Sequence, residues 1–109
     1  DESMPPAETR ATLLFTRAWA TEKLGRTAEA AALWEQLARD HPRSEHAAEA
    51  LVRLGDDRFK AEKFEEARGH YAAVLKDHPR SPLAVESRYK LGSSLYALER
   101  YMEAATEFD

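Results

Sequence analysis

The chain has no cysteine and no excess of positive charge. Among its 109 residues, 16 are Lys or Arg and 20 are Asp or Glu, which gives a formal net charge of -4 at pH 7. The lack of cysteine excludes disulfides, thiol catalysis and cysteine-ligated metals, and it fits an oxidising compartment as well as a reducing one. Because the sequence offers no basic field for a phosphate backbone, we expect no nucleic-acid partner.

Long apolar runs and the common catalytic motifs are absent as well. No stretch approaches the roughly 20 apolar residues that a membrane-spanning helix needs, and residues 1–10 are acidic and lack the apolar core of a signal peptide. We therefore expect no direct membrane insertion. There is also no glycine-rich phosphate loop, no Gly-x-Ser-x-Gly elbow and no His-Glu-x-x-His zinc motif. The sequence thus predicts a protein that is not an enzyme and needs no cofactor.

The sequence contains an internal repeat. The sequence Asp-His-Pro-Arg-Ser occurs at residues 40–44 and again at residues 77–81, 37 residues apart. Small and large residues recur at the same offset, at Ala30, Ala67 and Ala104, at Trp34, Tyr71 and Phe108, and at Leu54-Gly55 and Leu91-Gly92. The chain therefore contains two copies of one unit and a partial third.

The spacing of apolar residues within each copy is helical. Ala30, Leu33, Trp34 and Leu37 follow one another at steps of three and four, which places them on one face of a helix. No alternation typical of strands is present. The pattern predicts helices at about residues 7–24, 28–40, 44–61, 64–77, 82–98 and from 101 onward.

Serine and proline indicate where these helices begin and end. Ser44 and Ser81 are typical N-cap residues, and Pro82 stands where we expect the first residue of a helix. Pro42 and Pro79 cannot continue a helix, so each ends the one before it. The repeated unit is therefore a helix, a tight turn and a second helix.

Three such hairpins predict an all-α superhelix with a period of 37 residues. We expect a disordered tail at residues 1–6 and one domain at 7–109, with repeats at about 7–42, 44–79 and 81–109, the last one truncated. Stacked hairpins of this kind form a concave surface, which the first helix of each hairpin lines.

The middle copy resembles the tetratricopeptide repeat family. Leu54, Gly55, Phe64, Ala67, Tyr71 and Pro79 fall at the spacing of that family's signature. The third copy is similar, and the first departs most, with Arg17-Ala18 in place of Leu-Gly and Thr27 in place of an aromatic residue. The resemblance implies a scaffold that binds a protein or peptide in its concave groove.

The period of 37 residues departs from the usual 34, and the added residues should lengthen the first helix of each hairpin. Together with the His-Pro-Arg-Ser motif, this length resembles bacterial envelope members of the family, such as the Tol-Pal-associated periplasmic coordinator protein and the lipoprotein of the outer-membrane barrel assembly machinery. The resemblance implies a periplasmic or outer-membrane-associated protein, with the cytoplasm as the alternative.

Groove-facing positions of the family can be transferred to this chain through the Leu-Gly pair. The transfer implies a partner-binding set of Phe15, Trp19, Val52, Asp56, Phe59, Lys60, Tyr89, Ser93 and Tyr96. Aromatic residues on a concave surface suit an extended or helical peptide. The alternative is that these rings pack between adjacent helices. Glutamates at 22, 49 and 86 near the same face favour a basic or polar partner.

The four histidines, at positions 41, 46, 70 and 78, have poor spacing for a metal site. His41 and His78 occupy equivalent places at expected helix C-termini, where a protonated imidazole is favoured, so we expect no metal.

The last predicted helix is short, since Phe108 lies next to the final residue. We therefore expect either further repeats after Asp109 or an apolar end that another copy of the chain covers. In the second case the alternative function is a structural or self-assembly module that associates through this helix near Phe108.

Overall fold

The computed structural model describes residues 5–109, and every regular element in that range is a helix. The six helices are α1 (Ala7–Lys23), α2 (Thr27–Asp40), α3 (Glu45–Lys60), α4 (Phe64–Asp77), α5 (Ala84–Ala97) and α6 (Tyr101–Phe108). These bounds agree with the predicted ranges to within one residue, except at the start of α5, so the all-α prediction is confirmed. Most of the tail expected at residues 1–6 lies outside the described residues.

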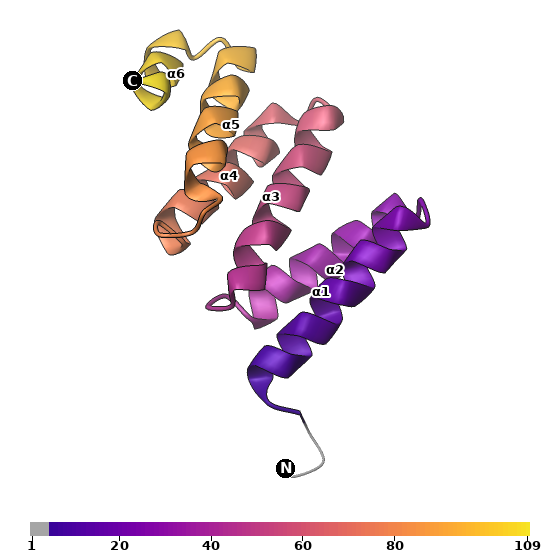
Figure 1. Ribbon diagram of the computed structural model, residues 1–109. Helices are drawn as coiled ribbons and strands as arrows, with labels where there is room; N and C mark the ends of the chain where they lie inside the picture. Colours follow the sequence, from indigo (N-terminus) through magenta and orange to yellow (C-terminus); the bar gives the residue numbers. More distant parts are fainter. Residues whose placement is uncertain (1–4) are drawn as a thin grey trace.

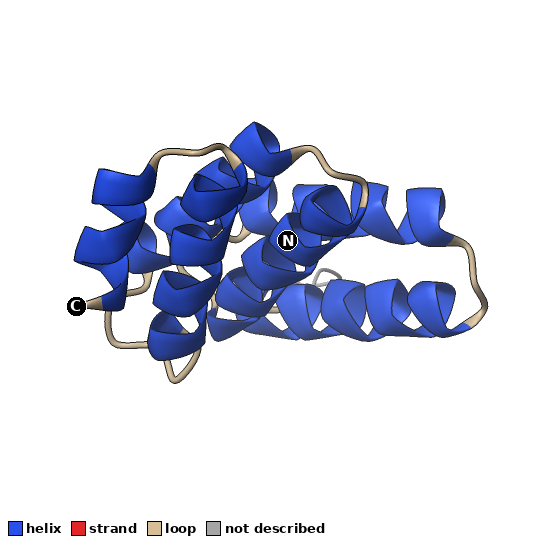
Figure 2. Cartoon of the chain, turned by 90° about the horizontal axis from the view of Figure 1, so that it is seen from above, coloured by secondary structure: helices blue, strands red, loops and turns tan. Residues whose placement is uncertain are grey.

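The helices form three hairpins that stack in sequence order. Each helix packs against the next one along the chain, so α1–α2, α3–α4 and α5–α6 follow one another in an elongated arrangement of 52 × 30 × 17 Å (Figure 1). Seen from above, helices joined by short connections account for the whole described chain (Figure 2). Within residues 5–109, no helix combines the length and the apolar character that a bilayer span requires.

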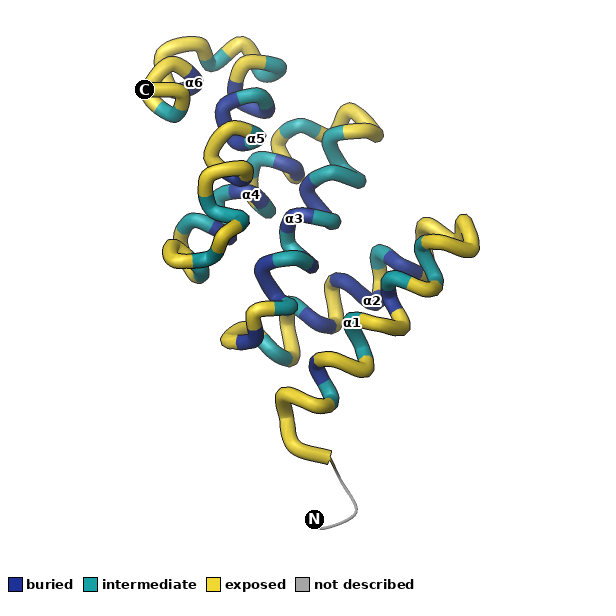
Figure 3. Tube along the Cα trace, in the orientation of Figure 1, coloured by how far each residue is buried: buried dark blue, intermediate teal, exposed yellow. Residues whose placement is uncertain are grey.

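The repeated small and large residues are the packing positions between hairpins. One core cluster joins α1, α2 and α3 and includes Ala30, Trp34 and Leu54, and a second joins α4, α5 and α6 around Tyr71 and Leu91. The buried segments lie where helices face one another, and the outward turns are exposed (Figure 3). Small residues let helix axes approach, and the large rings fill the space beside them.

Glycine is required where α3 approaches α4. A Cβ atom added to Gly55 would lie 2.5 Å from Cε1 of Tyr71, and one added to Gly92 would lie 2.5 Å from Cε1 of Phe108. Contacts this short are sterically forbidden, so a neighbour would have to move. A side chain at either position would therefore strike the neighbouring helix.

The two serine-containing loops begin their helices differently. Ser44 is the N-cap of α3, and its Oγ accepts a hydrogen bond from the His46 amide at 3.1 Å. Ser81 Oγ accepts in the same way from the Leu83 amide at 3.1 Å.

After Ser81, however, residues 82 and 83 form a turn and α5 begins only at Ala84, although the Ala84 amide donates to the Ser81 carbonyl just as the Ala47 amide donates to the Ser44 carbonyl. The expectation that Pro82 is the first helical residue is therefore wrong. The added residues of the longer period extend α3 to 16 residues but leave α5 at 14, because residues 82 and 83 stay in the turn.

Each hairpin turn has one residue in the left-handed conformation. This residue is Gly25 in the first turn, with φ of 80°, and Glu62 and Glu99 in the other two, each with φ of 63°. The flanking hydrogen bonds match among the three turns: the amide of Lys63, for example, donates to the carbonyl of Arg58. This is the Schellman arrangement that glycine normally completes.

Replacing Glu62 and Glu99 by glycine should stabilise the fold. A side chain in the left-handed region costs about 1 kcal/mol, and the gain is reduced by the greater freedom of glycine in the unfolded chain. We expect about 0.5 kcal/mol from each substitution, measured by urea denaturation followed by circular dichroism. Gly25→Ala is the matched reverse change and should lower stability by about 0.5 kcal/mol, because the same two effects act in the opposite direction. Destabilisation by either glutamate-to-glycine change would contradict this account.

Candidate partner-binding groove

The first helices of the three hairpins, α1, α3 and α5, lie on one side of the stack, with α2 and α4 behind them (Figure 1). Two pockets open along this side. The α3–α5 pocket lies near the C-terminal end of α3, and the loop pocket lies near its N-terminal end. Their linings decide which of the predicted groove residues are accessible to a partner.

The α3–α5 pocket has a volume of about 420 Å³. It is lined by Asp56, Phe59, Lys60, Tyr71, Tyr89, Lys90 and Ser93. Five of the nine predicted groove residues meet here, from two helices that are far apart in the sequence. The rings of Phe59 and Tyr89 form its aromatic walls, and Tyr71 borders it although it is only 1 % exposed.

Asp56 organises the polar side of this pocket. Its Oδ1 accepts a hydrogen bond from the Tyr71 hydroxyl at 2.6 Å and lies 2.9 Å from Lys90 Nζ, so it joins α3 to α4 and α5. Burial raises the pKa of Tyr71, and the hydrogen bond to Asp56 raises it further, so the hydroxyl stays protonated and donates. Lys60 is exposed at the rim, and among the described residues it forms no ion pair.

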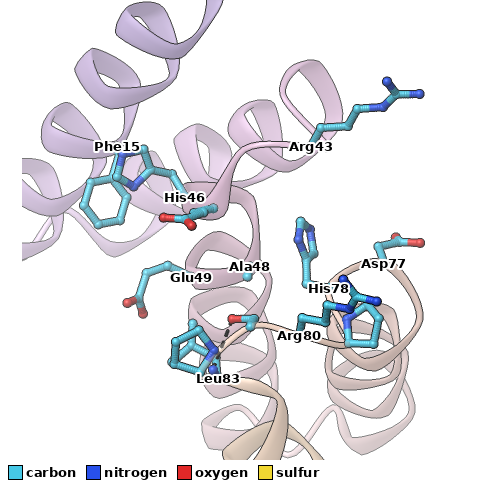
Figure 4. A pocket seen from close by; sticks show the side chains of 13 residues that line it. Phe15, Arg43, His46, Ala48, Glu49, Asp77, His78, Arg80 and Leu83 are labelled. Carbon is cyan, nitrogen blue, oxygen red and sulfur yellow. Dashed lines mark hydrogen bonds between the residues drawn. The ribbon is translucent and has the colours of Figure 1, made fainter.

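The loop pocket has a volume of about 650 Å³ and lies between α1, the start of α3 and the connection from α4 to α5 (Figure 4). Phe15 is the predicted residue found here, and its ring stacks on His46 with centroids 4.2 Å apart. Arg43 and Arg80, from the two copies of the repeated pentapeptide, also line the pocket, as do Pro79 and Pro82.

The loop residues were missed as groove residues by sequence reasoning. The pentapeptide was interpreted as a marker of the repeat, as a helix boundary and as a feature of envelope members of the family, but not as part of the groove. The repetition of the pentapeptide was the sequence signal that could have identified these loop residues. It places Arg43 just before α3 and Arg80 and Ser81 just before α5, and all three line the loop pocket.

Phe15 and Trp19 pack between helices more than they face solvent. Both are partly buried, and each ring centroid lies 5.8 Å from that of Trp34 on α2. The guanidinium of Arg53 covers Trp19, with its Cζ 4.3 Å from the ring centroid. These two rings therefore pack between adjacent helices, which is the alternative given above for the aromatic set. Phe15 also lines the loop pocket.

Val52 is not part of the accessible surface. It is only 2 % exposed, whereas its counterpart Tyr89 in the next hairpin is 65 % exposed. The predicted placement of Val52 in the groove therefore requires correction. The physical reason is that α3 has a hairpin on either side, and the short valine side chain does not reach past them.

The remaining predicted residues belong to α5. Tyr96 is 63 % exposed and lies outside both pockets, with its ring 5.2 Å from that of Tyr101. Ser93 lines the α3–α5 pocket, and its hydroxyl donates to the carbonyl of Tyr89 at 3.1 Å.

The three glutamates near the groove all have partners within the chain. Glu22 accepts a hydrogen bond from the indole of Trp34 at 3.2 Å. Glu49 pairs with Arg53 at 3.1 Å, and Glu86 lies 3.6 Å from Lys90. The charges of Glu49 and Glu86 are therefore compensated within the molecule, whereas Glu22 bonds to a neutral indole and keeps its charge, so the inference of a basic or polar partner now depends on Glu22 alone.

The histidines have separate local roles. His41 and His78 are the C-cap residues of α2 and α4, as predicted. His70 is partly buried on α4, and this burial lowers its pKa, with the nearby Arg58 acting in the same direction. In the described part of the chain, no three side chains of His, Cys, Asp or Glu come together as a potential metal site.

Stacked helical hairpins with an accessible concave side define a helical-repeat scaffold. One tetratricopeptide repeat profile matches residues 52–109, and a second matches residues 12–44. The chain belongs to the tetratricopeptide repeat family, whose members are generally protein-interaction modules, and neither matching profile describes a catalytic domain. No curated protein shows significant similarity to the chain.

Proposed function

We propose that this chain binds a segment of a protein partner along α1, α3 and α5, with the α3–α5 pocket as the main anchoring point. The observation that carries the proposal is the composition of this pocket: the aromatic rings of Phe59 and Tyr89 in its lining and the exposed Lys60 at its rim. Aromatic walls offer a large contact area at a small entropy cost, which is typical of anchoring pockets for peptides.

The charge of the pocket supports a particular kind of segment. Because Asp56 is paired with Lys90, Lys60 carries the remaining charge among the residues that line the pocket. An apolar or aromatic side chain seated against Phe59 and Tyr89, with an acidic or polar group beside it, would satisfy both features. The loop pocket, with Phe15 and two arginines, would hold a second part of the same segment.

A displayed library of random peptides provides the probe for this proposal. Peptides selected on the wild-type chain should lose affinity at least about tenfold on Tyr89→Ala and on Lys60→Ala, because both side chains are exposed at the pocket and contact the ligand directly. Binding is measured by fluorescence anisotropy with a labelled selected peptide.

Matched controls separate the groove from the rest of the surface. Tyr101→Ala removes an aromatic residue of α6 that is 53 % exposed, and Lys76→Ala removes an exposed lysine of α4, and neither residue lines a groove pocket. Both variants should bind the peptide like wild type. Equal loss on all four variants, or no loss on Tyr89→Ala and Lys60→Ala, would remove the groove as the binding site.

We also propose the bacterial cell envelope as the setting, with the cytoplasm as the alternative. The support for this is the 37-residue period and the repeated His-Pro-Arg-Ser motif, which resemble envelope members of the family. The family match itself covers tetratricopeptide repeats in general. Fractionation of cells that carry the tagged gene tests the proposal, and recovery only in the cytoplasm would refute it.

A further inference from the structure

The first helices of neighbouring hairpins contact one another through side chains at equivalent repeat positions, and the two contacts differ in chemistry. Between α1 and α3, the guanidinium of Arg53 covers the ring of Trp19, with its Cζ 4.3 Å from the ring centroid. Between α3 and α5, Lys90 Nζ lies 2.9 Å from the carboxylate of Asp56. Asp56 stands 37 residues after Trp19, and Lys90 stands 37 residues after Arg53. The cation–π pair and the ion pair therefore occupy the same place in successive repeats.

The surroundings of the Trp19 ring reappear in the lining of the α3–α5 pocket. Besides Arg53, the ring contacts Trp34, with centroids 5.8 Å apart, and Lys23, whose Nζ lies 5.4 Å from the ring centroid. The counterparts of these three neighbours in the next repeat all line the pocket, namely Tyr71, Lys60 and Lys90. The pocket is thus built like the place that the Trp19 ring occupies between the first two hairpins.

The α3–α5 pocket lacks a ring of its own at this place. Asp56 stands at the position of Trp19, and its short side chain reaches only Tyr71 and Lys90 at the side of the pocket. A hollow of about 420 Å³ remains. This volume lies within the range of roughly 300–1,000 Å³ that is typical of ligand pockets. An aromatic side chain from a partner would fill the space that Trp19 fills in the preceding repeat.

A cation at this repeat position can cover a ring while it stays paired with a glutamate. Arg53 does both, since it covers Trp19 and lies 3.1 Å from Glu49. Lys90 has the equivalent glutamate, Glu86, at 3.6 Å. Among aromatic side chains, Trp interacts most strongly with a cation placed over its face. The surroundings therefore favour a tryptophan over a smaller aromatic or an aliphatic residue.

We propose that a tryptophan side chain of the protein partner anchors in the α3–α5 pocket, beside Phe59 and Tyr89 and against the ammonium group of Lys90. This inference rests on the proposed binding of a protein segment and specifies the residue that anchors it. Lys60 at the rim would then face an acidic or polar group next to that tryptophan in the segment.

Peptides selected on the wild-type chain test the anchor, because their own side chains can be changed without altering the protein. The selected peptides should share a tryptophan, and its replacement by leucine should weaken binding at least about tenfold. Tetrafluorinated tryptophan keeps nearly the same shape but attracts a cation less. It should therefore weaken binding by about two- to fivefold. Fluorescence anisotropy with the labelled peptides measures each affinity.

A second test fills the pocket from within the chain. Asp56→Trp places a ring at the position that corresponds to Trp19, and it is combined with Tyr71→Phe so that no buried hydroxyl loses its acceptor. This double variant should bind the peptide at least about tenfold more weakly than Tyr71→Phe alone. Asp57→Trp in the same Tyr71→Phe background is the matched control, since Asp57 lines neither groove pocket, and it should bind like Tyr71→Phe alone. Circular dichroism verifies that all variants keep their helix content.

The outcomes distinguish this proposal from the proposed function. If binding depends on Tyr89 and Lys60 but the peptides carry no tryptophan, or tolerate leucine in its place, the groove binds a segment and the tryptophan anchor is refuted. Unchanged affinity of the fluorinated peptide would refute the contact with Lys90, and unchanged affinity of the Asp56→Trp variant would place the ring outside this pocket. Binding that depends on neither Tyr89 nor Lys60 would remove the proposed function and the anchor together.

Discussion

Gly55→Ala should lower the free energy of unfolding by about 2 kcal/mol. The new methyl group would lie 2.5 Å from the ring of Tyr71, which is 1 % exposed and held by its hydrogen bond to Asp56, so the ring cannot withdraw. Overpacking of this kind costs about 3 kcal/mol at its upper end, and the better helix propensity of alanine offsets about 1 kcal/mol.

Gly92→Ala is the matched comparison and should change stability by less than about 0.5 kcal/mol. The added group would lie equally close to Phe108, but that ring is 49 % exposed in the last turn of α6 and can turn away. The gain in helix propensity then cancels the remaining cost. Urea denaturation of both variants measures the change in the free energy of unfolding. Equal losses at the two positions would contradict the idea that the exposure of the neighbouring ring decides the cost.

Asp56→Ala should destabilise the fold by about 2 kcal/mol. The substitution leaves the buried hydroxyl of Tyr71 without its acceptor and removes the carboxylate opposite Lys90. An unsatisfied buried hydroxyl accounts for most of the loss, because Lys90 is 29 % exposed and keeps Glu86 as a partner. Adding Tyr71→Phe to the Asp56→Ala variant should therefore recover about 1 kcal/mol.

The neighbouring aspartate serves as the control. Asp57 pairs with Arg58 at 2.7 Å, but Arg58 also lies 3.4 Å from Glu35 and from Glu66, so its charge stays compensated when Asp57 is removed. Asp57→Ala should cost less than about 0.5 kcal/mol. Thermal and urea denaturation of both alanine variants provide the measurement. Similar losses for Asp56→Ala and Asp57→Ala would remove the special role assigned to Asp56.

Most of the fold was predictable because it depends on local periodicity. Helix positions follow from the steps of three and four between apolar residues, and the hairpin order follows from a repeat of 37 residues. The one misplaced helix start, at Pro82, depended on whether the chain forms a turn after Ser81 or enters the helix directly. The serine alone does not fix this choice, since Ser44 and Ser81 accept the same hydrogen bond but only α3 begins at the next residue.

The groove was predictable only in part. Residues of the middle and third hairpins met in one pocket as expected, because a shared repeat phase brings equivalent faces of α3 and α5 together. Exposure was not predictable, since Phe15, Val52 and Tyr89 hold the same place in the repeat and differ in how much surface their neighbours cover. Burial depends on contacts made by other hairpins, which no local pattern records.

The sequence by itself determined the helical class, the hairpin unit and the residues at which helices pack, since each depends on side-chain type within a few turns. Only the tertiary structure decided which aromatic rings remain open to a partner, that Asp56 is already engaged by Tyr71 and Lys90, and that the repeated loops border a second hollow. These features join residues from different hairpins, so they exist only after the hairpins have stacked.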